Sequence, residues 1–269
     1  MTILADILVR KREEVASASR SLPALKLEQK VAATPPPPDF QAALRNQVYP
    51  CPRLIAEVKQ RSPSKGVLCA DFNPLKLAET YAANGAAAIS VLTDEHFFGG
   101  SLDHLSAIAA LDMGIPLLRK DFIFDRYQLL QARAAGASAA LLIVAMLVPA
   151  QLSELLSAAA DLQIAALVEV HTASEIEVAL SAGADVIGIN NRNLHTFETS
   201  LDVAAALRPH VPPKICVVAE SGIRTRTDIQ TLAALAVDAV LIGEGLVTSP
   251  DVCSKVREFA QMDSSKEAG

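Results

Sequence analysis

Short apolar runs, rich in valine and isoleucine, recur along the chain from Arg53 onward, and each one closes on polar residues. The eight runs are LIAEVK (54–59), AAISVLT (87–93), IPLLRKD (115–121), AALLIVA (139–145), IAALVEV (164–170), DVIGINN (185–191), ICVVAES (215–221) and DAVLIGE (238–244). Successive runs end 21 to 33 residues apart, which leaves room for one strand, one loop and one helix in each interval. Because the runs lack strict apolar–polar alternation, the predicted strands are buried on both faces, as in a parallel sheet covered by helices.

The intervals between the runs have apolar residues at helical spacing, and helices are predicted over 73–83, 126–135, 149–161, 173–181 and 225–235. Four similar segments lead into strands: NGAAAISVL (84–92), AGASAALLI (135–143), AGADVIGIN (182–190) and LAVDAVLIG (235–243). Glycine in the first three suits a left-handed helix C-cap. This internal repeat predicts an α/β protein, a single (β/α)8 TIM barrel. A doubly wound sheet would have fewer strands and usually a G-x-G-x-x-G turn, which follows none of these runs.

The first fifty residues are predicted to form an N-terminal helical extension, and residues 51–269 the barrel. Ile7 and Val15 lie among charged residues at helical spacing, which predicts an amphipathic helix with a charged outer face that includes Lys11. The four prolines at 35–38 exclude regular helix or central strand and indicate a stiff connector. The extension is therefore interpreted as an accessory element.

Composition excludes several classes of protein. Of 269 residues 51% are hydrophobic, and 24 basic against 30 acidic side chains give a net charge of −6, so the chain is neither disordered nor polybasic. Aromatic residues make up 4%, with no tryptophan, which argues against nucleic acid as a partner. The uncharged stretch 134–153 has too short an apolar centre for a membrane span and fits a buried strand better. Without a secretory signal or a cysteine pattern for disulfides or zinc, we expect a cytoplasmic protein with no membrane partner.

Polar residues at the strand ends are the candidates for chemistry, because a parallel barrel places its active site at the carboxyl ends of its strands. They are Glu57 and Lys59 on the first run, Lys120 on the third, Glu169 on the fifth, Asn190 and Arg192 after the sixth, and Glu220 and Ser221 on the seventh. The lysines and glutamates follow apolar residues, and buried charges persist only when they are paired. The pattern predicts a lattice of lysine and glutamate side chains suited to acid and base catalysis.

The last two strands run into the glycine-containing loops AESGI (219–223) and IGEGL (242–246). Glycines let backbone N–H groups approach an anion, and these loops hold a phosphate in many such barrels, although tight turns alone would explain either glycine. Ser62 and Lys65, in a lid-like loop after the first strand, could add a hydroxyl and a positive charge. The five histidines form no metal-ligand pair, and we interpret them mostly as surface or loop residues. They are His96, His104, His171, His195 and His210.

The sequence resembles the indole-3-glycerol phosphate synthase family over essentially its full length. The shared motifs are IAEVKQRSPSKG (55–66), LTDEHFFGGS (92–101), LLRKDFIFDRYQ (117–128), LLIVAML (141–147), LVEVH (167–171), IGINNRNL (187–194), VAESGI (218–223) and VLIGEGL (240–246). The resemblance implies a carboxy-lyase of tryptophan biosynthesis (EC 4.1.1.48). Its substrate would be 1-(2-carboxyphenylamino)-1-deoxyribulose 5-phosphate, which closes to an indole with loss of carbon dioxide and water, without a cofactor or metal.

The resemblance also implies roles for individual residues. Lys120 would be the general acid, Glu169 the general base, and Lys59 the residue that holds the substrate carboxylate. Glu57 and Glu220 would orient the lysines and the substrate hydroxyls. The other implied substrate contacts are the polar pair Asn190 and Arg192, the phosphate contacts Ser62, Ser221, Gly222 and Gly243 with Glu244 in the same loop, and an apolar wall of Phe122, Leu141 and Ile143.

Several positions depart from the family pattern without removing a proposed catalytic group. They are Gln60-Arg61, Gly99, Ala236 where a glycine is usual, and Gly245 where a serine is usual. A phosphoribosylanthranilate isomerase would need an acid and base pair of cysteine or aspartate at the strand ends, and a Schiff-base aldolase would use Lys59 or Lys120. A non-catalytic phosphate binder or a scaffold for a partner enzyme is the alternative from another class. We expect a monomer or weak homo-oligomer.

Overall fold

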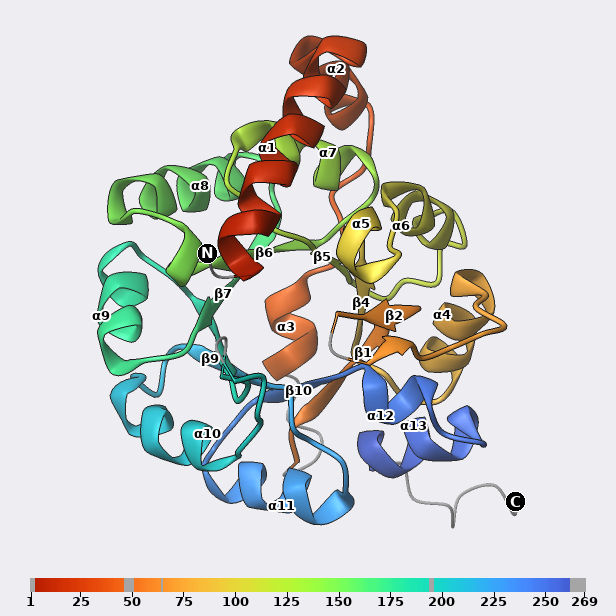
Figure 1. The fold of residues 1–269 in the computed structure, drawn as a ribbon, viewed down its shortest axis with the longest axis vertical. Helices are drawn as coiled ribbons and strands as arrows, with labels where there is room; N and C mark the ends of the chain where they lie inside the picture. Colours follow the sequence, from red (N-terminus) through yellow and green to blue (C-terminus); the bar gives the residue numbers. More distant parts are fainter. Residues whose placement is uncertain (1–2, 46–50, 64, 194–195, 262–269) are drawn as a thin grey trace.

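Eight parallel strands close into a barrel in the computed structural model, which describes residues 3–45, 51–63, 65–193 and 196–261 (Figure 1). Around the barrel the order is β1-β10-β9-β8-β7-β6-β5-β4, so each strand pairs with its neighbour in the chain and β10 pairs with β1. The strands are β1 (Arg53–Val58), β4 (Ala88–Leu92), β5 (Leu117–Lys120), β6 (Ala139–Ile143), β7 (Ala165–Val170), β8 (Val186–Asn190), β9 (Cys216–Glu220) and β10 (Ala239–Ile242). All eight predicted strands are confirmed, and with them the barrel.

Helices surround the barrel and bury the outward faces of the strands. They are α4 (Pro74–Ala83), α6 (Leu102–Ala109), α7 (Arg126–Ala134), α8 (Pro149–Asp161), α9 (Ala173–Ser181), α10 (Asp202–Leu207), α11 (Arg226–Ala234) and α13 (Val252–Ala260). Short elements follow three of the strands, namely α5 (Glu95–Phe98) after β4, the 3-10 turn η1 (Val144–Met146) after β6 and α12 (Glu244–Val247) after β10. A second 3-10 turn, η2 (Arg208–His210), follows α10. Among the described residues no helix is long and apolar enough to cross a membrane, and the stretch 134–153 includes the buried strand β6.

The helix-to-strand turns confirm the C-cap prediction. Gly85, Gly136 and Gly183 all adopt left-handed backbone conformations, with φ of 95°, 92° and 94°. The fourth copy of the turn places Ala236 at φ 55°, in a region that costs a residue with a Cβ. The repeat therefore keeps the same turn geometry even where the glycine has been replaced.

The interior of the barrel is filled by side chains at every second strand position. Ile55, Leu118, Leu141, Leu167 and Val218 belong to one buried cluster, which ends below the charged residues of the strand ends. A second and larger apolar cluster lies between the strands and the surrounding helices. The barrel is thus a packed core that supports a polar mouth.

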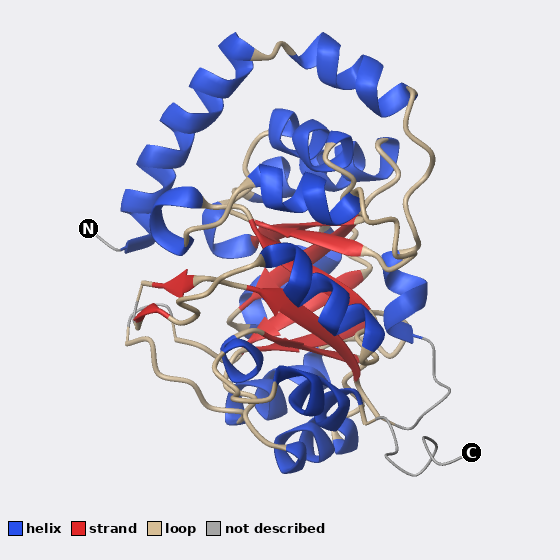
Figure 2. Ribbon diagram, turned by 90° about the vertical axis from the view of Figure 1, so that its right-hand side faces the viewer, coloured by secondary structure: helices blue, strands red, loops and turns tan. Residues whose placement is uncertain are grey.

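The N-terminal segment arches from one end of the barrel to the other (Figure 2). Helix α1 (Ile3–Ser21) starts beside the mouth, α2 (Ala24–Ala32) packs on α7, and an irregular connector with the prolines leads to α3 (Phe40–Arg45). Phe40 and Leu44 of α3 join the interior cluster of the barrel, at the end opposite the mouth. The predicted helix and connector are confirmed. Residues before 51 nevertheless supply part of the barrel packing, and the domain boundary there stays a prediction.

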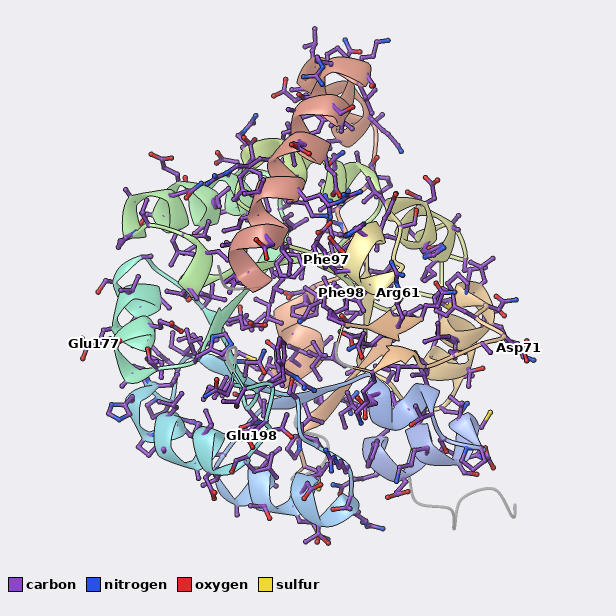
Figure 3. The ribbon with its side chains drawn as sticks, viewed as in Figure 1. Arg61, Asp71, Phe97, Phe98, Glu177 and Glu198 are labelled. Atoms are coloured by element: carbon purple, nitrogen blue, oxygen red, sulfur yellow. The ribbon has the colours of Figure 1, made fainter. Side chains whose placement is uncertain are left out.

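The loop after β1 forms a small antiparallel hairpin, β2 (Arg61–Ser62) with β3 (Gly66–Val67). The guanidinium of Arg61 donates hydrogen bonds to the backbone carbonyls of Glu95 and His96 in α5. Figure 3 shows Arg61 beside Phe97 and Phe98, near the barrel mouth, whereas Asp71 and Glu177 lie at the outer rim. The predicted lid-like loop is therefore attached to the loop after β4.

Candidate active site

Lys120, Glu169 and Glu220 converge on one point at the mouth of the barrel. Lys120 Nζ lies 3.6 Å from Glu169 Oε2 and 3.3 Å from Glu220 Oε2. Lys120 and Glu220 end β5 and β9, and Glu169 is the last residue but one of β7. Each side chain belongs to the inward-facing series of its strand. The two carboxylates are almost fully buried, so the ammonium neutralises charge that solvent cannot reach. The sequence prediction of a lysine facing glutamates across the barrel agrees with this geometry.

Burial and charge shift the pKa values within this cluster in ways that suit proton transfer. Burial alone would lower the pKa of Lys120, but the surrounding carboxylates raise it above the ordinary lysine range, so the side chain stays an ammonium. Burial, helped by the neighbouring carboxylates of Glu169 and Glu57, raises the pKa of Glu220 to about 7 against the opposing charge of Lys120. One group therefore holds a proton while another titrates near neutral pH.

Glu57 and Lys59 form a second pair on the same side of the first strand, with Lys59 Nζ 3.4 Å from Glu57 Oε2. Their spacing of two residues places both side chains toward the mouth, as predicted from sequence. Lys59 Nζ also lies 5.7 Å from the ring centroid of Phe98, within cation–π range. This pair extends the charged cluster toward the loop after β4.

Two of the buried carboxylates have room because a glycine lies next to each of them, on or just after the adjacent strand. A Cβ at Gly188 of β8 would overlap Glu220 Oε1, and a Cβ at Gly243, after β10, would overlap Glu57 Oε2. The backbone of Gly243 has φ −118°, so its identity reflects this close approach and not a left-handed turn. The close approach of Glu57 explains why position 243 is a glycine, but it does not test the prediction that Gly243 contacts a phosphate.

The loops after β9 and β10 and the hairpin after β1 contain the residues predicted to bind phosphate. Ser221 and Gly222 both have positive φ, 65° and 78°, and for a serine that conformation is costly. The hydroxyl of Ser62 is buried without a hydrogen-bond partner in the described structure. Lys65 forms an ion pair with Glu244, which joins the hairpin to the loop after β10. Phosphate binding at these residues stays a prediction.

Asn190 ends β8 and Arg192 follows in the next loop, as predicted. Asn190 Oδ1 accepts a hydrogen bond of 3.0 Å from the backbone N–H of Arg192. The Arg192 guanidinium donates to the carbonyl of Phe197, at 2.9 Å, and so remains within its own loop. This loop supplies polar groups at the mouth, while Leu194 and His195 lie outside the described residues.

The predicted apolar wall also assembles at the mouth. Leu141 and Ile143 are buried on β6, and Phe122 packs against the same interior cluster. Phe98 was not predicted, and its ring centroid lies 6.1 Å from that of Phe122. Phe98 also lies beside the Lys59 ammonium, and these apolar groups together could receive a flat aromatic group.

His171 is a functional candidate that the sequence reasoning missed. His171 Nε2 lies 3.4 Å from Glu169 Oε1, and its backbone N–H donates to Glu175 Oε2 at 2.6 Å. Burial would lower the pKa of His171, but Glu175 and Glu169 raise it. His171 does lie in the loop directly after β7, as interpreted, but its side chain turns toward Glu169 at the mouth. The signal was available, because His171 follows Glu169 by two positions and so points to the same side of the strand.

Lys11 is a residue that the sequence reasoning misplaced. It was assigned to the charged outer face of the first helix, but it is 4% exposed and lies on the inner face with Ile7 and Val15, four residues to either side. Its ammonium meets Asp94 and Asp121 in the loops after β4 and β5. Lys11 was assigned to the outer face because it is charged, although its spacing of four residues from Ile7 and Val15 places it on the buried face.

The described parts of the chain contain no group of three or more histidine, cysteine, aspartate or glutamate side chains arranged to hold a metal ion. The cysteines at 51, 69, 216 and 253 are all free thiols. What the site offers is a proton-holding lysine, paired carboxylates and an apolar wall.

Comparison with known proteins places these features in one family. A sequence model of indole-3-glycerol phosphate synthase matches residues 4–259. The chain is 51% identical over 260 residues to indole-3-glycerol phosphate synthase of Dehalococcoides mccartyi (strain CBDB1), covering 96% of this chain and 99% of that protein. It is 50% identical over 265 residues to the protein of that name from Roseiflexus sp. (strain RS-1), covering 96% and 98%. The structure of 3-hexulose-6-phosphate synthase from Salmonella typhimurium matches with a TM-score of 0.61 over 78% of this chain and 97% of that one. At 15% identity, that match shows the fold alone.

Proposed function

The chain belongs to the indole-3-glycerol phosphate synthase family, which makes it a carboxy-lyase of tryptophan biosynthesis, and from this premise we propose its substrate and mechanism. The substrate is 1-(2-carboxyphenylamino)-1-deoxyribulose 5-phosphate and the product is indole-3-glycerol phosphate. In the reaction a carbon–carbon bond closes the five-membered ring, the carboxyl carbon leaves as carbon dioxide, and the ketose oxygen leaves as water.

The observation that supports this mechanism best is the placement of Lys120 Nζ 3.6 Å from Glu169 Oε2 and 3.3 Å from Glu220 Oε2. Loss of the ketose oxygen requires a proton on that oxygen, and the Lys120 ammonium is the donor. Restoring the conjugated ring requires removal of a proton, for which Glu169 is the base. A paired acid and base held across the mouth can supply both steps without solvent.

Binding groups around this pair hold the flexible substrate in a reactive conformation. Lys59 receives the substrate carboxylate, with Glu57 fixing the direction of its ammonium at 3.4 Å. The aromatic ring lies against Phe122, Leu141 and Ile143. Holding both ends of an open chain removes much of the entropic cost of ring closure.

The phosphate lies at the opposite end of the substrate in this proposal. Ser62, Ser221, Gly222 and Gly243 bind it, with Glu244 close by. Backbone N–H groups of these loops and the unpartnered Ser62 hydroxyl are the donors. Asn190 and Arg192 contact the atoms between the phosphate and the closing ring.

The test is turnover of Lys120→Met and Glu169→Gln beside the parent. Because the chain has no tryptophan, indole emission reports product without a tryptophan background. Each variant is expected to lose about 10²-fold or more in kcat, a typical contribution of a general acid or base. Lys76→Met on α4 and Glu177→Gln on α9, both exposed, make the same chemical changes away from the mouth and should keep parental rates.

Near-parental rates in both site variants would remove the assigned roles. An inactive parent would remove the proposed substrate. Borohydride added with substrate should leave no covalent adduct, because ring closure by this route needs no protein imine. An adduct on Lys59 or Lys120 would favour aldolase-type chemistry instead.

A further inference from the structure

Helix α1 reaches the barrel mouth through the buried side chain of Lys11. Its side chain is only 5% exposed, and it extends from the helix toward the loops that follow β4 and β5. The ammonium contacts Glu14 Oε2 at 2.7 Å, Asp94 Oδ2 at 2.8 Å and Asp121 Oδ1 at 3.1 Å. Burial would lower the pKa of Lys11, but Asp121 and Asp94 raise it, so the group remains charged.

The two aspartates shape the loops that they belong to. Asp94 Oδ1 accepts the backbone N–H groups of Phe97 at 2.7 Å and Phe98 at 3.3 Å, which caps α5. Asp121 Oδ1 accepts the N–H of Phe122 at 2.8 Å. Each carboxylate thus fixes the backbone of a phenylalanine at the mouth.

Those two phenylalanines are the aromatic neighbours of the charged cluster. The Phe98 and Phe122 ring centroids lie 6.1 Å apart, and Lys59 Nζ lies 5.7 Å from the Phe98 ring. Asp121 also follows Lys120 directly in the chain. A shift of either loop would therefore move part of the apolar wall or the backbone of the proposed acid.

Removal of the Lys11 charge would take the counter-ion from Asp94 and one of two counter-ions from Asp121 among the described residues. Asp94 Oδ2 is buried, with no hydrogen bond and no ion pair besides Lys11 in the described part of the chain. Asp121 would keep Arg119 Nη2 at 2.9 Å and the Thr93 hydroxyl at 2.6 Å. An unpaired buried carboxylate draws in water or moves outward, and here outward movement opens the loop after β4.

We propose that Lys11 is a positioning residue for the reaction, tying α1 to Asp94 and Asp121 so that Phe98 and Phe122 stay in place against the substrate ring. The inference rests on the proposed function for the identity of that ring. It gives the N-terminal helix a role at the mouth, besides its packing on the barrel.

The experiment compares Lys11→Met with Lys11→Arg and with Arg10→Met. Arg10 lies one residue away on the exposed side of α1 and pairs with Glu14 at 3.6 Å, so Arg10→Met changes the same helix without touching the loops. In Lys11→Met we expect KM to rise tenfold or more while kcat stays within about threefold. Lys11→Arg should stay within about threefold of the parental KM, and Arg10→Met should be parental.

Hydrogen exchange, read by mass spectrometry on peptides covering 94–99 and 121–124, tests the tether without any substrate. The amides of Phe97, Phe98 and Phe122 are bonded to the two aspartates, so exchange there should be at least tenfold faster in Lys11→Met than in Arg10→Met. Parental KM together with parental exchange in Lys11→Met would overturn the proposal. An inactive parent would overturn the proposed function, while the exchange rates would still report on the tether.

Lys11→Met/Asp94→Asn separates positioning from simple destabilisation. Asparagine keeps the capping oxygen on α5 but removes the unpaired charge, so the thermal midpoint should recover toward the parental value. The raised KM should persist, because the link to α1 is still absent. Recovery of both quantities would mean that Lys11 only offsets buried charge, and the proposal would fail. If Lys11→Met alone does not fold, this double variant provides the kinetic test.

Discussion

Replacing Glu220 by glutamine should make the free energy of unfolding less dependent on pH. Glu220 is 1% exposed and its pKa is raised to about 7, first by burial and then by the nearby carboxylates. The glutamine amide has nearly the same shape as the carboxyl group and can still accept a hydrogen bond from Lys120. It cannot ionise, so the substitution removes one titration and little of the packing.

The sign follows from proton binding in the two states. Between the ordinary glutamate value of 4.5 and about 7, the folded parent keeps a proton on Glu220 that the unfolded chain has released. Stability contributed by this group is therefore fully present at low pH and is lost as pH rises through that window. A shift of this size corresponds to about 3 kcal/mol, with a slope of at most about 1.4 kcal/mol per pH unit.

Urea denaturation of parent and Glu220→Gln at pH 5, 6, 7 and 8 measures the difference. The variant should gain stability over the parent progressively toward pH 8. The pKa of His171 is also raised, chiefly by Glu175 and Glu169 and to a smaller extent by Glu220, so its contribution to stability falls with rising pH in both proteins. The difference between the two slopes therefore reports the Glu220 titration together with the small part of the His171 shift that Glu220 causes. Glu177→Gln on the exposed side of α9 should follow the parent. A constant difference between parent and Glu220→Gln across this range would refute the reasoning.

Two further predictions concern backbone positions. Ala236→Gly should stabilise the protein by about 0.5–1 kcal/mol in urea denaturation, because φ 55° is costly for alanine. Gly183→Ala, at φ 94°, should destabilise the protein by about 1 kcal/mol or more. Equal stability of the parent and both variants would contradict this. Gly188→Ala should lower kcat about tenfold or more, because the new methyl group displaces the Glu220 carboxylate from Lys120. Gly245→Ala is the control and should keep the parental kcat, since its Cβ would meet Ile242 at an ordinary 3.5 Å. Indole emission measures both rates, and a parental kcat in Gly188→Ala would argue against the crowding.

Local patterns were sufficient for the barrel and for much of its mouth. Strand length, helical spacing and the repeated turn are properties of neighbouring residues, so the eight units could be recognised without knowing how they pack. The closed parallel sheet then brings every strand end to one face. For that reason Lys120, Glu169 and Glu220 could be placed together from sequence alone.

The two-residue spacing of inward-facing side chains was not applied to His171, which is why this residue was missed. The spacing of two residues correctly placed Glu57 and Lys59 on one side, and it would have placed His171 beside Glu169 as well. His171 lies just beyond the strand, where the sequence offered no reason to extend the alternation. The apolar run and β7 both end at Val170, so the inward position of His171 continues the alternation one residue past the strand.

Contacts between distant segments were decided only by the tertiary structure. Whether Lys11 is exposed depends on where α1 lies against the loops after β4 and β5, and the residues that meet there are more than eighty positions apart. The ion pair of Lys65 with Glu244 and the close approach of Glu57 to Gly243 depend likewise on how separate loops fold over the mouth. Sequence periodicity fixes which face of an element a side chain occupies, whereas its partner across space is chosen by packing and charge balance in the whole fold.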